Sequence, residues 1–410
     1  SDFGCPLHNL IPEWNDLLYR GQEREALRRL LVTAPFPEFT GHVCPALCEK
    51  ACNLAEDGVT NRDNELYLIE TGFAKGWISP RVPSERSGKK VAVIGAGPSG
   101  LTCAGDLAKM GYDVTIFEAL HKAGGVLVYG IPEFRLPKDE VVAKEIENVK
   151  SLGVEIKTDY IIGRSETIDE LMDNEGYEAV YIASGAGLPM FMHIPGEQAL
   201  GVYSANEYLT RTNLMKAYRE DYDTPINKGN KTVVVGGGNV AMDAARTALR
   251  LGSDVTVVYR RSEKELPARA EEVHHAKEEG IEFALLTNPV EILEDEEGLV
   301  RGIRVIKMEL GEPDASGRRR PVEIAGSEYE IECDTVIMAL GTSPNPLISS
   351  TTENLETNKR KCIVADEETG ATSRPGVFAG GDCATGAATV ILAMGAGRKA
   401  AKGIDEYLSK

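Results

Sequence analysis

The sequence contains no apolar run of eighteen residues, no signal peptide and no excess of basic residues. A chain without such a run or leader is not expected to cross a membrane, and we assign it to the cytoplasm. The formal net charge is −19, with 64 acidic against 45 basic residues. This charge argues against nucleic acid and against an anionic membrane surface as partners.

Cysteine is sparse over most of the chain and concentrated at its beginning. Four of the eight cysteines lie early in the chain, namely Cys5, Cys44, Cys48 and Cys52. In a cytoplasmic protein such a group indicates a metal site rather than disulfides. Cys5 and Cys44 are each followed by proline, a pattern typical of iron–sulfur proteins. The sequence therefore predicts an iron–sulfur cluster, with zinc and free thiols as alternatives.

Length and composition predict an α/β protein of several domains. A chain of 410 residues with 42 % hydrophobic residues and 42 glycines has room for two to four domains with many tight turns. Residues 11–33 carry apolar side chains at helical spacing, and residues 78–90 form a polar, proline-containing linker. We expect a small helical module ahead of the linker.

The first dinucleotide motif begins with an apolar strand at residues 91–94. A G-x-G-x-x-G turn follows, made of Gly95, Gly97 and Gly100, and leads into a helical run over residues 98–110. Such glycines permit a tight turn, backbone approach to a pyrophosphate and close helix–strand packing. The next strand ends in Glu118, where a ribose hydroxyl needs an acceptor. The stretch predicts an adenine dinucleotide with a free ribose, and Gly125 is expected to border it.

The motif repeats with a different ending. The strand at residues 231–235 leads into a G-x-G-x-x-A turn, made of Gly236, Gly238 and Ala241. The next strand, over residues 254–259, is followed by Arg260 and Arg261 instead of an acid. A guanidinium accommodates a 2′-phosphate where a carboxylate would accept a ribose hydroxyl. The second site is therefore predicted to bind NADP(H), the alternative being a solvated arginine pair.

A third glycine-rich segment lies near the end of the chain, over residues 376–386. It contains Gly381 and Asp382 and precedes a helical run from about residue 388 to residue 408. A carboxylate placed between a strand and a helix can bind the ribityl hydroxyl of a flavin, or it can serve as a helix cap. After two dinucleotide motifs, we interpret it as belonging to an FAD site.

The chain resembles the small (β) subunit of NADPH-dependent glutamate synthase over essentially its whole length. The resemblance lies in CPLHN at Cys5, PEFTG leading to CPALCEKAC at Cys44, YGIPEFRLPK at Tyr129 and GGDCATGAATVI at Gly380. It extends to sister modules: the large subunit of bifurcating NADH-dependent ferredoxin:NADP⁺ oxidoreductase, sulfide dehydrogenase, and the front of dihydropyrimidine dehydrogenase.

The resemblance implies a fold of two Rossmann-like domains, an FAD domain with an inserted NADP domain, preceded by a small α-helical iron–sulfur module. The iron–sulfur module is expected at 1–85 and the NADP-binding domain at 193–340. The FAD-binding domain is expected in two segments, at 86–192 and at 341–410.

The resemblance also implies the cofactors and the residues that hold them. The FAD set is Gly95, Gly97, Pro98, Ser99, Gly100, Glu118, Gly125, Arg135, Gly341, Gly381, Asp382 and Thr389. The NADPH set is Gly236, Gly238, Asn239, Val240, Arg260, Arg261 and Arg269.

Two [4Fe–4S] clusters are implied as well. Cys5, Cys44 and Cys48 would hold one cluster, with Glu65 at the position of its non-cysteine ligand. Cys52 would belong to the other, whose further cysteines lie upstream of the Cys-Pro at Cys5 in the family. Here only four residues precede Cys5, and the chain begins at Ser1 rather than at a methionine, as in a fragment or a processed protein.

Together these expectations predict an oxidoreductase that transfers electrons from NADPH to a partner protein. Hydride is expected to pass from NADPH to N5 of FAD where the two folds meet, and single electrons are expected to continue through the iron–sulfur module to a partner. No protein acid or base is needed, so no catalytic residue is assigned. The expected partner is the FMN-containing large subunit of glutamate synthase, or another acceptor such as ferredoxin, in a hetero-oligomer.

Other functions fit the sequence less well, although the sister modules above remain alternatives. A disulfide reductase would need a C-x-x-C or C-x4-C pair beside the flavin, and the sequence has neither. A relay module without turnover is disfavoured because both glycine-rich turns and the residues around them are intact.

Overall fold

The computed structural model describes residues 4–80, 82–313, 317 and 319–410, so the expectation attached to Ser1 lies outside the described residues. The chain forms two compact units. The first combines both ends of the chain, residues 1–128, 133–187 and 343–410, and the second comprises residues 129–132 and 188–342. No helix among the described residues is long and apolar enough to cross a membrane.

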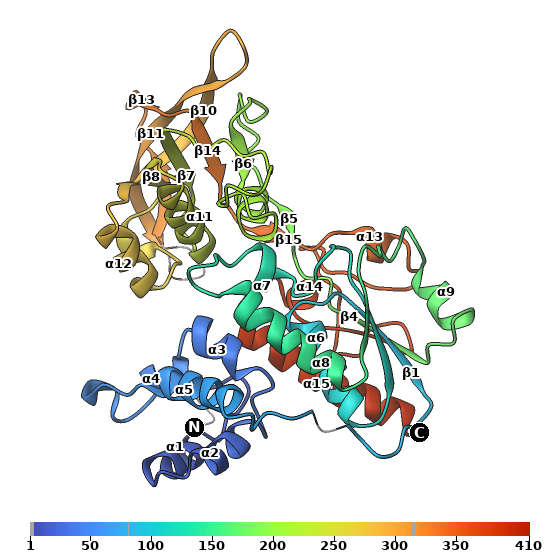
Figure 1. Ribbon diagram of the computed structural model, residues 1–410. Coiled ribbons are helices and arrows are strands. Elements are labelled where there is room, and N and C mark those ends of the chain that lie inside the picture. Colours follow the sequence, from blue (N-terminus) through green and yellow to red (C-terminus); the bar gives the residue numbers. More distant parts are fainter. Residues whose placement is uncertain (1–3, 81, 314–316, 318) are drawn as a thin grey trace. The chain divides into compact units, whose positions relative to one another are not determined.

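The first unit begins with a helical module (Figure 1). Its elements are α1 (Ile11–Tyr19), α2 (Glu23–Leu30), α3 (Pro37–Val43), α4 (Leu47–Lys50), the 3₁₀ turn η1 (Ala55–Asp57) and α5 (Asn61–Ala74). The helical spacing over residues 11–33 is split in two at Gly21, whose φ of +72° ends the first helix. Trp14, Leu27 and Leu30 are fully or almost fully buried and form the centre of this module.

A five-stranded parallel sheet forms the rest of the first unit, in the order β16-β4-β1-β2-β3. Its strands are β1 (Lys90–Ile94), β2 (Asp113–Phe117), β3 (Glu155–Lys157), β4 (Ala179–Ile182) and β16 (Val377–Ala379). The helices are α6 (Pro98–Lys109), α7 (Val126–Tyr129), the π-helix η2 (Lys138–Val142), α8 (Ala143–Ser151), α9 (Ile168–Asp173), α13 (Leu347–Ser350), α14 (Asp382–Thr385) and α15 (Val390–Leu408).

Helices α6 and α15 pack closely because glycine lies at their contact. A Cβ added to Gly397 of α15 would lie 2.2 Å from the carbonyl oxygen of Ser99 in α6. Every residue of α6 from Pro98 to Ala108 is buried. The two helices therefore form one layer against the sheet.

The helical module meets the rest of the first unit through buried charges. Glu38 of α3 is 2 % exposed, and Lys144 Nζ of α8 lies 3.5 Å from its Oε1. The neighbouring Glu145 is 4 % exposed, and Asn148 Nδ2 donates to its Oε2 at 3.1 Å. Oxygen Oε2 of Glu38 and oxygen Oε1 of Glu145 have no hydrogen-bond partner among the described residues. Two carboxyl groups are thus buried here with too few donors.

The second unit contains the other parallel sheet, in the order β6-β14-β7-β8-β9. Its strands are β6 (Val202–Ser204), β7 (Lys231–Val235), β8 (Asp254–Tyr259), β9 (Glu282–Leu285) and β14 (Thr335–Met338). Its helices are α10 (Ala205–Leu209), the π-helix η3 (Thr210–Leu214), α11 (Asn239–Arg250), the 3₁₀ turn η4 (Glu263–Glu265) and α12 (Ala270–Glu278).

Residues 287–332 form an antiparallel sheet in the second unit. Strand β11 (Val300–Pro313) pairs with β10 (Thr287–Glu294), β12 (Arg319–Glu323) and β13 (Tyr329–Glu332). A separate pair joins β5 (Leu188–Pro189) to β15 (Thr342–Ser343). Strand β11 is the longest of these strands, at 14 residues.

Candidate functional site

The first glycine-rich turn has a shape that only glycine allows. Gly95 follows β1 with a φ of +105°, and a Cβ on it would lie 2.4 Å from the carbonyl oxygen of Ala183. A Cβ on Gly100 would lie 1.9 Å from the carbonyl oxygen of Gly95. Because neither position can hold a side chain, the chain turns sharply and α6 starts directly above the end of β1.

An open backbone surface lies at the start of α6. A Cβ on Gly97, the N-cap of this helix, would meet only the Cα of Gly125, at 3.9 Å. A Cβ on Gly125 would instead lie 2.8 Å from the Cα of Gly97. A side chain on Gly125 would therefore fill the space beside the helix N-terminus, where a pyrophosphate would lie. These residues fit a bound dinucleotide.

Glu118 lies just beyond β2, next to this turn. It is 6 % exposed, and its two carboxylate oxygens accept hydrogen bonds from the backbone N–H of Ala96 (2.8 Å) and of Leu120 (2.9 Å). Burial raises the pKa of its carboxyl group, while these backbone donors lower it. A carboxylate has about four acceptor positions, so Glu118 can also accept a ribose hydroxyl.

Asp382 lies on the other side of the same turn, at the start of α14. Gly381 has a φ of +70°, and a Cβ on it would lie 3.0 Å from the Cβ of Ser99. The Oγ of Ser99 lies 2.6 Å from the hydroxyl of buried Tyr181, a contact that sequence reasoning missed. Burial raises the pKa of Asp382 to about 6, although its Oδ1 accepts a hydrogen bond from the N–H of Ala388.

The remaining residues of the FAD set are placed as follows. Pro98 is the first residue of α6, and Thr389 is the N-cap of α15, with no hydrogen bond from its side chain to the helix. Arg135 is half-buried and precedes η2. Gly341 belongs to the second unit, where its φ is +110° and its carbonyl accepts a hydrogen bond from the N–H of Met190 at 3.1 Å.

The second glycine-rich turn repeats the geometry of the first. Gly236 has a φ of +141°, and a Cβ on it would lie 2.3 Å from the carbonyl oxygen of Ala339. A Cβ on Gly238, the N-cap of α11, would have no atom within 4 Å. The start of α11 is therefore open to a pyrophosphate, as at the first turn. Val240, in the first turn of α11, is 44 % exposed.

The three arginines of the NADPH set differ in how they are held. Arg260 is exposed just after β8, and Nε of Arg261 donates to the carbonyl oxygen of Arg319 at 2.9 Å. Arg269 is the N-cap of α12, and its backbone N–H donates to Oδ1 of Asn239 at 2.9 Å. Its Nη2 donates to Oε1 of Glu272 at 2.9 Å. Arg269 is thus fixed to the glycine-rich turn at one end and to an acid at the other.

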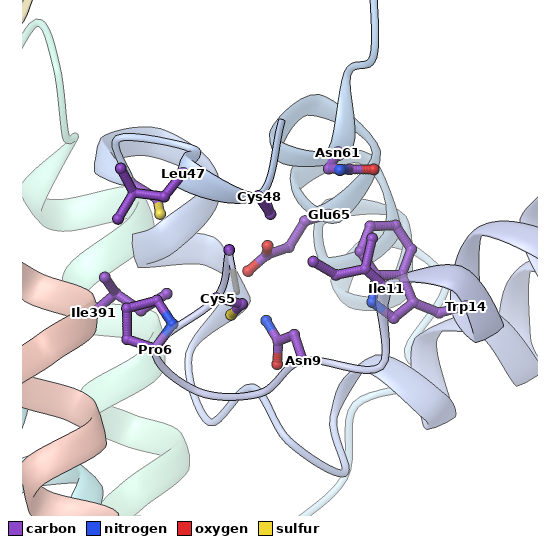
Figure 2. A pocket seen from close by; sticks show the side chains of 12 residues that line it. Cys5, Pro6, Asn9, Ile11, Trp14, Leu47, Cys48, Asn61, Glu65 and Ile391 are labelled. Atoms are coloured by element: carbon purple, nitrogen blue, oxygen red, sulfur yellow. The ribbon is translucent and has the colours of Figure 1, made fainter. Parts of the chain in front are cut away.

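Three of the four clustered cysteines surround one pocket in the helical module (Figure 2). Its lining includes Cys5, Cys44 and Cys48 together with Glu65, and Ile391 of α15 closes one side. Cys52 does not line this pocket and is only partly exposed. Three thiols and a carboxyl group around one cavity are a donor set that fits an iron–sulfur cluster.

Burial dominates the protonation of this pocket. It raises the pKa of Cys44 to about 12 and that of Glu65 to about 7. It also raises the pKa of Cys5 and of Cys48. Thr40 Oγ1 donates a hydrogen bond to Glu65, a contact that the sequence motifs did not reveal. Metal binding here would release protons, because thiolates are the ligands.

Among the residues that the structure describes, no three His, Cys, Asp or Glu side chains form a group that could hold one metal ion. Figure 2 shows the labelled Cys5, Cys48 and Glu65, which line the pocket together with Cys44.

The other cysteines do not form a reactive pair. Cys103, Cys333, Cys362 and Cys383 are buried free thiols. Cys383 Sγ lies 3.3 Å from the carbonyl oxygens of Ile182 and Gly380, and burial raises its pKa to about 11. A buried thiol with a raised pKa is unreactive, so Cys383 is not suited to act as the redox thiol of a disulfide reductase.

Known protein families match both regions of the chain. A family model described as pyridine nucleotide-disulphide oxidoreductase matches residues 89–397. A second, described as dihydropyrimidine dehydrogenase domain II, 4Fe-4S cluster, matches residues 1–77. FprA of Mycobacterium tuberculosis, solved in complex with NADPH, aligns over 78 % of this chain and 85 % of its own, with a TM-score of 0.66 and 19 % identity. At that identity the likeness shows the fold.

Curated relatives cover almost the whole chain. The small chain of glutamate synthase [NADPH] of Escherichia coli is 38 % identical over 99 % of this chain and 88 % of its own length. AegA of Escherichia coli and subunit beta of the NADP(+)-dependent formate dehydrogenase of Moorella thermoacetica are each 39 % identical, over 99 % and 98 % of this chain. This chain spans only 63 % and 59 % of those two proteins.

Proposed function

Because the chain belongs to the pyridine nucleotide-disulphide oxidoreductase family and carries a 4Fe-4S domain, we propose that it is the NADPH-oxidising flavoprotein subunit of a glutamate synthase. In this role it takes electrons from NADPH and delivers them to an FMN-containing large subunit. The observation that carries the proposal is the pair of glycine-rich turns, one followed by Glu118 and the other by Arg260 and Arg261.

The residues of the chain bind and orient; they do not exchange protons with substrate. The start of α6 and the open backbone at Gly97 would hold the pyrophosphate of FAD, while Glu118 and Asp382 would accept hydrogen bonds from its hydroxyl groups. The start of α11 and the three arginines would hold NADPH. When bound, FAD accepts two electrons at once and the cluster carries single electrons, chemistry that the protein itself does not supply.

The cysteine pocket supports an electron exit from the flavin. A Cβ on Gly395 of α15 would lie 3.6 Å from a methyl group of Leu7 and 3.7 Å from the carbonyl oxygen of Pro6. The Cys5 loop therefore packs directly on α15, the helix that follows Asp382. One helix links the flavin loop to the cysteine pocket, which suits transfer between them.

The first test is an anaerobic titration of the purified chain with NADPH and with NADH, followed by flavin absorbance, with iron and sulfide assayed on the same sample. We expect NADPH to bleach the flavin at far lower concentration than NADH, with iron and sulfide present. An equal response to both nucleotides would contradict the 2′-phosphate assignment. Bleaching without iron would contradict the cluster.

The partner needs a second experiment. Adding a glutamate synthase large subunit should give NADPH-dependent glutamate formation from glutamine and 2-oxoglutarate, and omitting either chain should abolish it. The formate dehydrogenase relative supplies the competing outcome. If the chain reduces NADP⁺ only when a formate-oxidising subunit is added, the glutamate synthase assignment is wrong.

A further inference from the structure

A row of alternating arginine and glutamate side chains connects α11 with α12 in the second unit. Arg246 Nη1 donates to Oε2 of Glu272 at 3.0 Å, and Arg246 also makes a forked contact with Glu279 at 2.8 to 3.1 Å. Arg250 donates to both oxygens of Glu279, at 2.7 and 3.0 Å. The other end of the row is the pair between Glu272 and Arg269, whose backbone N–H is bound to Asn239.

Glu272 is the acid at the centre of this row. Its side chain is 6 % exposed, yet it pairs on both sides with guanidinium groups, one from Arg246 and one from Arg269. A buried carboxylate without such partners would be strongly unfavourable, and the two arginines supply them. In turn it holds the guanidinium of Arg269, whose side chain is 17 % exposed, in one orientation.

Arg269, which Glu272 holds in one orientation, lies beside the second glycine-rich turn. The backbone N–H of Ala268 donates to the carbonyl oxygen of Gly237 at 3.0 Å, so the segment before α12 lies on the glycine-rich turn. Arg260, by contrast, is exposed. A long side chain that is already held loses less conformational entropy when an anion binds.

We propose that Glu272 is a positioning residue for nucleotide recognition: it orients Arg269 at the edge of the Gly236–Asn239 turn to bind the 2′-phosphate of NADPH. The proposal rests on the NADPH role given above and adds an acid to a site otherwise made of glycines and arginines. Arg246 holds Glu272, and Glu279 with Arg250 anchors Arg246.

The test is equilibrium binding, by calorimetry, of NADP⁺, NAD⁺ and two fragments to the full chain. One fragment, adenosine 2′,5′-bisphosphate, carries the 2′-phosphate, and the other, adenosine 5′-diphosphate, carries only the pyrophosphate. Loss of one charge-assisted contact corresponds to a roughly tenfold weaker affinity. Glu272→Gln should therefore weaken NADP⁺ and the bisphosphate about tenfold and leave NAD⁺ and the diphosphate unchanged.

Matched variants distinguish the loss of Arg269 positioning from a general loss of stability. Arg269→Gln should weaken the same two ligands by a similar factor, and the double variant should be no weaker than either single one, because both substitutions remove one shared interaction. Glu278→Gln alters an exposed acid on the same helix and should change nothing. Glu279→Gln loosens Arg246 without touching Glu272, and should lower stability while weakening NADP⁺ by less than Glu272→Gln does.

Three results would overturn the inference. They are an unchanged affinity for NADP⁺ in Glu272→Gln, an equal weakening of NADP⁺ and NAD⁺, and additive effects in the double variant. If the unmodified chain itself binds the bisphosphate no better than the diphosphate, the NADPH preference fails, and the role of Glu272 fails with it. If the unmodified chain clearly prefers the bisphosphate but Glu272→Gln binds NADP⁺ with unchanged affinity, the role of Glu272 is refuted and the NADPH preference stands.

Discussion

Glu145 should make the first unit less stable as the pH rises from 5 to 8, and Glu145→Gln should remove that loss. The carboxyl group is buried with one oxygen unpartnered among the described residues, and burial raises its pKa from 4.5 to about 8. The folded chain therefore keeps the proton up to about pH 8, whereas the unfolded chain releases it near pH 4.5. Between these values the unfolded state binds fewer protons, so the free energy of unfolding falls as the pH rises.

The size of the effect follows from the two pKa values. One pKa unit corresponds to about 1.4 kcal/mol, so the raised pKa of Glu145 amounts to roughly 5 kcal/mol across this range. Water entering the site on ionisation would reduce this figure, which is therefore an upper value. Buried Glu38 adds a negative charge nearby, and Lys144 partly offsets it.

The assay is urea unfolding at half-unit steps from pH 5 to pH 8.5. The difference in unfolding free energy between Glu145→Gln and the unmodified chain should shift by several kcal/mol in favour of the variant. Glu145→Met, which also lacks the titrating group, should show the same trend. Glu147→Gln is the control, because Glu147 lies on the same helix with its side chain 68 % exposed. Parallel curves for Glu145→Gln and the unmodified chain would refute the reasoning.

Three further outcomes are expected. Gly100→Ala should abolish FAD binding, measured as flavin per chain, since its Cβ would lie 1.9 Å from a carbonyl oxygen, whereas Gly105→Ala on the same helix meets only a methyl group at 4.0 Å and should bind normally. Cys44→Ala should lower iron and sulfide per chain, while Cys333→Ala, a buried thiol of the second unit, should not; equal iron in both would argue against the pocket. Hydrogen bonds from Arg250 and Arg246 lower the pKa of Glu279 from 4.5 to about 2, so its stabilisation is present above pH 4.5 and is lost as the pH falls through 2. Because its side chain is 24 % exposed, Glu279→Gln should cost the second unit about 1 to 2 kcal/mol at pH 7, and no loss in urea unfolding would contradict this.

Local sequence signals predicted the elements around each glycine-rich turn. The helix expected over residues 98–110 runs from Pro98 to Lys109, and the strand expected over residues 254–259 has those bounds. Such elements depend on short patterns: a buried apolar run, glycines at fixed spacing, and a helix start. The sequence predicted two dinucleotide-binding folds in one chain, and the two parallel sheets confirm this prediction.

Contacts between residues far apart in the chain could not be predicted in this way. The partner of Ser99 is Tyr181, 82 positions away, and Arg246 pairs with acids 26 and 33 positions away. Glu38 and Glu145 look like ordinary surface acids of two amphipathic helices until the fold buries them together. Their burial depends on how whole helices pack, and no local spacing encodes that.

The closing of the cysteine pocket by Ile391 has a consequence for biosynthesis. Ribosomes add about 5 to 20 residues per second, so roughly 15 to 60 s separate the appearance of the helical module from that of α15. During this time the second unit can fold, but the cysteines lack one wall of their pocket. Cluster insertion before α15 is in place would leave iron and sulfide open to water on that side. We therefore expect newly made chains to acquire the metal only after α15 has been synthesised and has packed against the helical module.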